Sequence, residues 1–263
     1  SWLGLVDFSN CGQTSHTGPS QSQCDSEYSG STLDNLVSVS GGFQTWEVPI
    51  DGIYSIEASG AQGGGTIGGS GATVSGDFEL FQGDLLTIVV GQQGLSESYS
   101  RSYQAGGGGG GSFVALNGSP LIIAGGGGAS GSDQVGYGGI SSETDGRTGS
   151  AGNGGSQSEG CGGAGFTGNG TGSAHGGITV AKSFTNGANG GIGSSSGGTG
   201  YGGFGGGGCD GHADGGGGGG YSGGNGYNDG AAGGGGGSYN IGTNPVNQSG
   251  VNTGHGYVII DRL

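Results

Sequence analysis

Two runs of glycine, at 106–111 and 125–128, constrain most strongly what this chain can fold into. They flank an apolar hairpin pattern, 113–116 followed by 121–124, with Asn117 and Gly118 as the turn. Polyglycine alone would be disordered, and an isolated two-stranded hairpin is marginally stable in water. We therefore expect each part to depend on the other for its order.

The composition is typical of a low-complexity chain, yet the apolar residues are not scattered. Of 263 residues 80 are glycine, and the formal net charge is −15, a combination found in disordered segments. The apolar residues nevertheless gather into runs of strand length, for which a solvating linker has no need. We expect a folded, mainly β protein with very little α-helix and an unusual scaffold.

The glycines are not spaced as in collagen, which needs glycine at every third position and abundant proline. Here they occur in runs, and the chain has four prolines. A glycine run can instead form an extended helix of the polyproline II type, whose backbone N–H and C=O groups find no partner within the segment. Neighbouring runs can satisfy these groups on one another, because glycine has no Cβ to separate them. We predict a bundle of polyglycine II helices anchored by a hydrophobic core.

Strand patterns occur at both ends of the chain. Before the hairpin they cover 3–8, 36–39, 43–48, 53–58, 73–81 and 85–90, and a final strand at 254–261 must return to the first sheet. Aromatic residues beside glycine runs, such as Phe166 and Phe204, are expected as pegs on the surface of the bundle.

We predict one domain over 1–263, into which the glycine-rich region is inserted. The predicted sheet strands lie mainly in 1–130 and 251–263. The predicted polyglycine insertion lies mainly in 131–240, with shorter runs near 63–71, 106–111 and 125–128.

The cysteines indicate an oxidising compartment. Their number is even and their spacing matches no zinc or thioredoxin pattern, which favours two disulfides. We expect local pairing, Cys11 with Cys24 and Cys161 with Cys209.

Three N-glycosylation sequons point to the same compartment; they begin at Asn117, Asn169 and Asn247. Asn117 falls at the hairpin tip, where a glycan would be tolerated. No apolar run approaches the length of a membrane span, and no leader-like segment follows Ser1. We predict an extracellular, secreted glycoprotein.

We expect neither catalysis nor a cofactor or metal. The four histidines, His16, His175, His212 and His255, show no metal-ligand spacing. The segment 193–197 fits the nucleophile-elbow pattern and several glycine runs fit the dinucleotide fingerprint. Neither pattern has the strand before it and the helix after it that the chemistry requires.

The charge of −15 disfavours nucleic acid and favours basic partners or divalent cations. The same charge also keeps an otherwise neutral surface soluble. Both interpretations stay open at the level of the sequence.

A series of motifs resembles the extracellular glycine-rich region of the anaplastic lymphoma kinase and leukocyte tyrosine kinase receptors. The motifs include FSNCG at 8–12, GPSQSQC at 18–24, TWEVP at 45–49, VGQQG at 90–94, the stretch 105–128, GGFGGGGC at 202–209 and GHG at 254–256. They follow in order over nearly the whole chain. The resemblance implies a tumour-necrosis-factor-like β-sandwich, or jelly roll, with an inserted bundle of polyglycine helices.

Two functions are compatible with these features. The first is a secreted structural module that assembles with copies of itself into filaments or matrix. The apolar residues Trp2, Leu3, Leu5 and Val6 would then add to the sheet edge of a neighbour, although they would equally serve as the first strand of their own sandwich. The second is a ligand-binding receptor ectodomain that recognises a basic protein, because in the resembling family this region contributes to binding a basic cytokine. Those receptors continue into a membrane span and a kinase, which we do not expect here.

Overall fold

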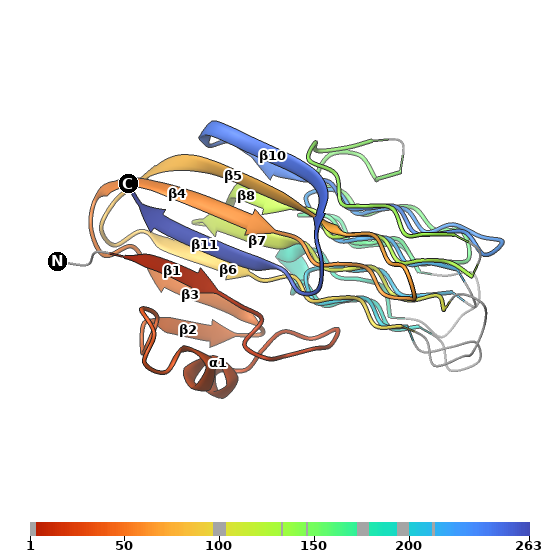
Figure 1. The fold of residues 1–263 in the computed structure, drawn as a ribbon, viewed down its shortest axis with the longest axis horizontal. Coiled ribbons are helices and arrows are strands. Elements are labelled where there is room, and N and C mark those ends of the chain that lie inside the picture. The colour runs from red at the N-terminus through yellow and green to blue at the C-terminus, as the bar shows by residue number, and fades with distance from the viewer. Residues whose placement is uncertain are drawn as a thin grey trace.

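Two antiparallel β-sheets form one end of the protein, and glycine-rich segments run side by side from the ends of their strands to the other end (Figure 1). The computed structural model describes residues 4–96, 104–132, 134–145, 147–172, 179–193, 200–211 and 214–263. The first described strand, β1 (Leu5–Phe8), and the C-terminus both lie at the sandwich end (Figure 1).

The two sheets have the following order of strands. The first sheet runs β1 (Leu5–Phe8), β11 (Tyr257–Arg262), β4 (Gly52–Ser59), β5 (Gly71–Leu80) and β10 (Thr243–Asn252). The second runs β2 (Val37–Ser40), β3 (Phe43–Glu47), β6 (Leu85–Val89), β7 (Ser112–Leu116), β8 (Ser119–Ala124) and β9 (Tyr239–Asn240). The described part also holds the helix α1 (Gln21–Tyr28) and the 3₁₀ turn η1 (Phe184–Asn186).

The prediction of a mainly β sandwich with very little helix is confirmed, and the predicted strands lie close to the observed ones. The helix α1, the turn η1 and the strands β9 and β10 are not among the predicted elements. The helix α1 has a capping box, in which Ser20 and Gln23 satisfy each other's backbone N–H groups, and this signal is readable in the sequence. Strands β9 and β10 place the return of the chain to the sheets at Tyr239, earlier than the predicted 251.

The hydrophobic core lies between the two sheets and follows from strict alternation along the strands. On β4, Tyr54, Ile56 and Ala58 are fully buried, whereas Ile53 is 44% exposed on the opposite face. Trp46 from β3 reaches the same core, and its ring centroid lies 6.3 Å from that of Phe8 in an edge-to-face contact. The period of two therefore determines which side of each strand faces the core.

A second apolar cluster covers the other face of the second sheet. Phe113 and Ile123 point into it from β7 and β8, and Phe166, Phe184 and Phe204 cover them from the glycine-rich region. Phe166 stacks on Phe184 with ring centroids 4.9 Å apart. The expectation that Phe166 and Phe204 lie on the bundle surface is wrong: Phe204 is fully buried and Phe166 is 7% exposed. Because both faces of β7 and β8 are covered, these strands read as continuous apolar runs.

The glycine runs belong to none of the strands or helices, and their backbones bond to one another. Successive N–H groups of the run 106–111 donate to different neighbours in turn. The pairs are Gly107 with Leu95, Gly108 with Gly208, Gly109 with Gly127, Gly110 with Gln92 and Gly111 with Gly205. Every third residue thus bonds to the same neighbouring segment, 92–95 or 205–208. A period of three is what the predicted polyglycine II helices require; the helix type itself stays a prediction.

These positions need glycine for space and not for an unusual backbone angle. Within the runs 106–111 and 125–128 no glycine has a φ between +20° and +160°. A Cβ added at Gly126 would lie closer than 3.0 Å to the backbone of Gly109, and one added at Gly108 would meet that of Gly217 in the same way. By contrast, Gly118 has a φ of +79° and open space around it.

We predict that Gly126→Ala destabilises the protein by about 3 kcal/mol, because an added Cβ overpacks rigid backbone that cannot move aside. Gly118→Ala serves as the control, since it leaves the packing intact and costs only about 1–2 kcal/mol of backbone strain. Urea unfolding of both variants measures the difference. Equal stability of Gly126→Ala and the wild type would show that the runs do not pack as described.

Candidate functional site

Both predicted disulfides are present with the expected pairing. Cys11–Cys24 ties the segment after β1 to α1, with 4.9 Å between the Cα atoms. Cys161–Cys209 joins two glycine-rich segments, with 5.0 Å between the Cα atoms. All four cysteines are buried, so one disulfide stabilises the sandwich end and the other the glycine-rich region from the interior.

The three sequon asparagines lie in exposed positions. Asn117 has a φ of +52° at the β7–β8 turn, as expected for the first residue of an Asn-Gly hairpin turn. The Oδ1 atom of Asn169 accepts hydrogen bonds from the Ser183 N–H and from Asn186 Nδ2, both at 3.0 Å. In both Asn169 and Asn247 the side-chain oxygen accepts hydrogen bonds, whereas a glycan would be attached to the side-chain nitrogen.

The residues predicted for self-assembly differ in their exposure to solvent where the structure describes them. Trp2 and Leu3 lie outside the described residues. Leu5 and Val6 belong to β1, which pairs with β11 in its own sandwich; Val6 is fully buried and Leu5 is 48% exposed. The Thr32 hydroxyl donates to the Leu5 carbonyl at 2.9 Å on β1, the edge strand. Val6 is thus a core residue, and only Leu5 of the two has an accessible side chain.

The outward face of the first sheet gathers carboxylates. They are Asp7 on β1, Glu57 on β4, Asp77 and Glu79 on β5, and Asp261 on β11, and we call this set the acidic sheet face. Cross-strand pairing aligns its members: Asp261 and Asp77 both lie opposite Ser55, and Asp7 and Glu57 both lie opposite Ile259. Neighbouring strands are about 4.8 Å apart, so the acidic sheet face extends over three such spacings, from β1 to β5.

Within the described part of the chain, no cation forms an ion pair with the acidic sheet face. Two members accept hydrogen bonds from neutral groups, Glu57 from the Tyr257 hydroxyl at 2.9 Å and Asp77 from Asn244 Nδ2 at 2.8 Å. Arg262 turns its guanidinium to the Asp51 carbonyl instead. Partial burial raises the pKa of Asp7. The sequence analysis missed this face, although its acids alternate with buried residues along the strands.

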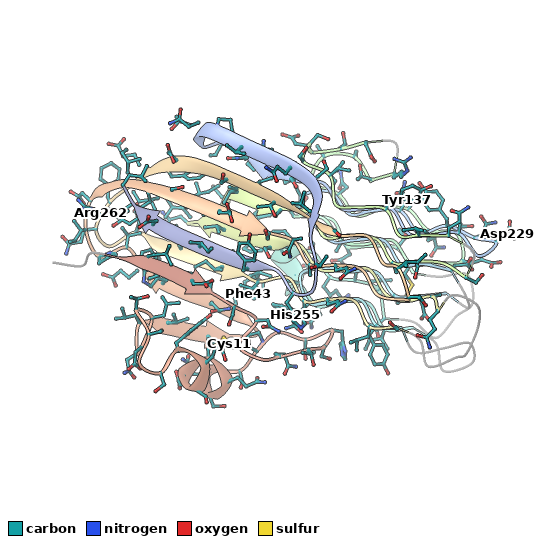
Figure 2. The ribbon with its side chains drawn as sticks, in the orientation of Figure 1. Cys11, Phe43, Tyr137, Asp229, His255 and Arg262 are labelled. Carbon is teal, nitrogen blue, oxygen red and sulfur yellow. A yellow bond between two sulfur atoms is a disulfide. The ribbon has the colours of Figure 1, made fainter. Side chains whose placement is uncertain are left out.

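A buried carboxyl group holds together loops at the far end of the glycine segments. Asp214 is 1% exposed and accepts a hydrogen bond from the Gly230 N–H at 2.7 Å. Neighbouring Asp229 lies at the tip that points away from the sandwich (Figure 2). Burial raises the pKa of Asp214 to about 7, and the nearby Glu159 adds to this rise while the Gly230 N–H opposes it.

We predict that Asp214 makes the protein less stable as pH rises. The native state holds its proton up to about pH 7, whereas the unfolded chain releases it near 3.8. The free energy of unfolding therefore falls between these values, by up to about 1.4 kcal/mol per pH unit. Asp214→Asn should remove this fall, and the exposed control Glu79→Gln should keep it. Urea unfolding at pH 5 and pH 8 tests this, and an unchanged pH dependence in Asp214→Asn would contradict it.

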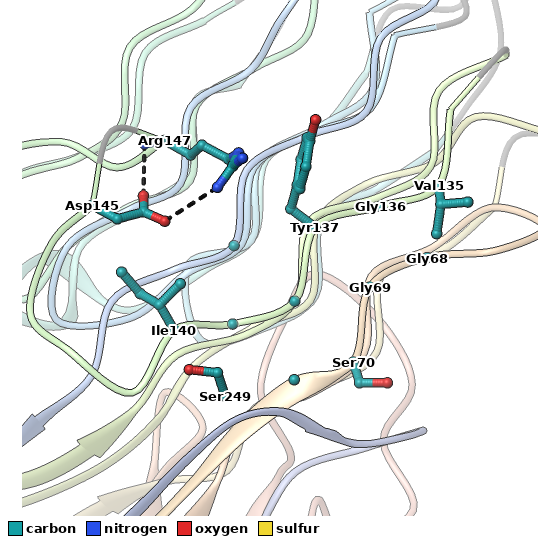
Figure 3. Close-up of a pocket in the computed structure, with 14 residues that line it drawn as sticks. Gly68, Gly69, Ser70, Val135, Gly136, Tyr137, Ile140, Asp145, Arg147 and Ser249 are labelled. Atoms are coloured by element: carbon teal, nitrogen blue, oxygen red, sulfur yellow. Dashed lines mark hydrogen bonds and ion pairs between the residues drawn. The ribbon is translucent and has the colours of Figure 1, made fainter.

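A groove opens where the glycine segments meet the first sheet (Figure 3). Its volume is about 450 Å³, and the segments 68–70, 135–140 and 249–250 line it together with Asp145, Arg147 and Gly235. The guanidinium carbon of Arg147 lies 4.2 Å from the centroid of the Tyr137 ring, and Arg147 Nη1 lies 3.6 Å from Asp145 Oδ2. The groove thus combines an aromatic ring, an ion pair and a floor of glycine residues. We call these glycines the glycine floor; they are Gly68, Gly69, Gly136, Gly138, Gly139, Gly235 and Gly250.

Sequence reasoning missed the groove because its walls come from segments far apart in the chain. In the sequence, Tyr137 is one of several aromatic residues that stand beside glycine, and Arg147 belongs to no motif. Within the described ranges, no three His, Cys, Asp or Glu side chains gather closely enough to hold a metal ion. The helices of those ranges include none with the length and apolarity needed to cross a bilayer.

No protein-family model matches the chain. The mouse leukocyte tyrosine kinase receptor is 40% identical to it over 95 residues, which cover 33% of this chain and 11% of the receptor. The chain thus spans about a tenth of the length of that relative. This partial similarity and the two disulfides are consistent with an extracellular location.

Proposed function

We propose that this chain is a glycosylated, non-enzymatic extracellular module that binds a basic protein through the acidic sheet face. The observation that carries the proposal is the gathering of five carboxylates on one sheet, none of which forms an ion pair within the described residues. Clustered like charges cost stability unless a partner neutralises them. A basic ligand would recover that cost on binding.

Apolar side chains on the same face support a protein as the ligand. Leu5, Ile53 and Val246 are 48%, 44% and 56% exposed between or beside the carboxylates. Protein interfaces combine apolar contacts with charged groups that steer association and fix orientation. A face of this kind suits a folded basic protein better than a small cation, which would need convergent ligands.

The similarity to the mouse receptor supports the same proposal. It concerns 11% of that protein, so its other activities are not transferred to this chain. The sequence resemblance to the glycine-rich extracellular region of such receptors, which contributes to binding a basic cytokine, agrees with an acidic binding surface.

We predict that the double variant Asp77→Asn/Asp261→Asn binds a basic cytokine of that receptor family at least tenfold more weakly than the wild type. The loss should appear mainly in the association rate and shrink at high salt, as expected for electrostatic steering. Surface plasmon resonance at low and high ionic strength measures both effects.

The matched control is Asp25→Asn/Asp34→Asn, which removes the same net charge from exposed positions outside the acidic sheet face. It should bind nearly as the wild type does. An equal loss in both double variants would show that net charge, and not this face, attracts the ligand. No binding to the wild type would contradict the proposal.

Self-assembly is a second candidate, and the observation that favours it is the edge strand β10. This strand pairs with β5 on one side, its residues are exposed over 243–251, and Val246 and Val251 are each more than half exposed. Such an edge offers unpaired backbone groups to a second copy. Pro245 and two register irregularities limit the stretch that is able to pair.

If self-assembly is a function, the purified native protein should form ordered filaments visible by electron microscopy at high concentration. Val246→Glu should reduce their number, because it places a carboxylate at the contact between two acidic copies. Leu36→Glu, at an exposed residue preceding β2, is the matched control. A protein that stays monomeric at high concentration would contradict self-assembly.

A further inference from the structure

We propose that the groove of Figure 3 is a saccharide-binding site, which the inner sugars of a glycan on Asn247 of the same chain occupy. This inference rests on the glycosylation included in the proposed function. It assigns to Tyr137, Arg147 and the glycine floor the role of holding that glycan against the protein.

The groove has the size and the lining for sugar rings. Its volume of about 450 Å³ falls within the range of small-molecule sites, about 300–1,000 Å³. Tyr137 is 37% exposed and offers a flat ring on which the C–H face of a pyranose packs. Its backbone is held in place, because its carbonyl accepts the Gly128 N–H at 2.8 Å and its N–H donates to Gly233 at 3.3 Å.

The polar groups of the groove match hydroxyl groups and not a charged ligand. Arg147 is paired with Asp145, so the two side chains together contribute no net charge while both keep exposed polar atoms. Ser70 adds a hydroxyl, and within the described ranges the Gly138 N–H donates no hydrogen bond. The glycine floor lets a ring approach the backbone closely. The chemistry therefore favours a neutral sugar over an acidic one.

Arg147 also fixes the orientation of the aromatic ring. Its guanidinium carbon lies over the Tyr137 ring, 4.2 Å from the ring centroid. In Figure 3 the guanidinium and the Tyr137 ring stand side by side, with Asp145 on the far side of Arg147. A ring held by its neighbours loses little freedom when it binds a sugar.

The sequon at Asn247 begins on a strand that enters the groove. Its third residue, Ser249, lines the groove together with Gly250. Residues two apart on a strand lie about 7 Å from each other, so Asn247 lies within about 7 Å of the groove-lining residue Ser249. Asn240 Nδ2 donates to Asn247 Oδ1 at 2.9 Å and holds the side chain in position. The inner sugars of a glycan thus start within reach of Tyr137.

The test compares glycans within one molecule. The full chain is secreted from glycosylating cells and treated in its native state with an endoglycosidase that cleaves between the first two sugars. Site-resolved mass spectrometry then gives the release rate at each sequon. The glycan on Asn247 should be released at least tenfold more slowly than that on Asn117, which lies at an open hairpin tip, and denaturation should abolish the difference.

Two variants identify the groove as the cause of protection. Tyr137→Ala should raise the release rate at Asn247 to that at Asn117, and Arg147→Gln, a change at a half-exposed residue, should raise it partly. Tyr201→Ala, outside the groove, is the matched control and should leave the protection intact. If Tyr137→Ala does not fold, the release rate of Arg147→Gln still tests the proposal.

Equal release rates at Asn247 and Asn117 in the native wild type would overturn the inference. So would protection that survives both groove variants. Glycans on Asn117 and Asn169 but none on Asn247 would overturn it and leave the glycoprotein proposal standing. Absence of glycan from all three sequons would contradict both.

Discussion

Hydrogen bonding between glycine backbones at close range is the constraint on which half of this protein depends. The runs have no side chains to bury, so their N–H and C=O groups must find partners on neighbouring runs. That pairing is possible only where two backbones approach within the space of a Cβ, as Gly126 and Gly109 do. Because glycine loses the most conformational entropy on ordering, the pairing needs outside support.

The sandwich gives that support in two ways. Strands β7 and β8 are flanked by the two longest glycine runs of the region 105–130, so the core fixes where those runs start and end. The aromatic cluster around Phe184 and Phe204 then fastens later parts of the insertion to the outer face of the second sheet. The Cys161–Cys209 disulfide ties the insertion to itself.

The sequence predicted what is local and periodic. Alternation and short apolar runs predicted most strands of both sheets, Asn117-Gly118 predicted the hairpin turn, and the number and spacing of the cysteines predicted two disulfides. Strand β10 was not predicted, because it is exposed on both faces and its sequence shows no alternation of apolar and polar residues. The groove was not predicted either. Tyr137 and Ser249 come together only because of the path that the glycine segments take, and no pattern of side chains in the sequence indicates that path.

The period of three in the backbone hydrogen bonds limits how the length of these runs is able to change. Each residue turns the chain by about a third of a revolution, so one inserted or deleted glycine redirects every later N–H to a different neighbour. A change of three residues restores the original partners. Within the paired parts of the runs, viable length variants should therefore differ by multiples of three, whereas the connecting loops are free of this restriction.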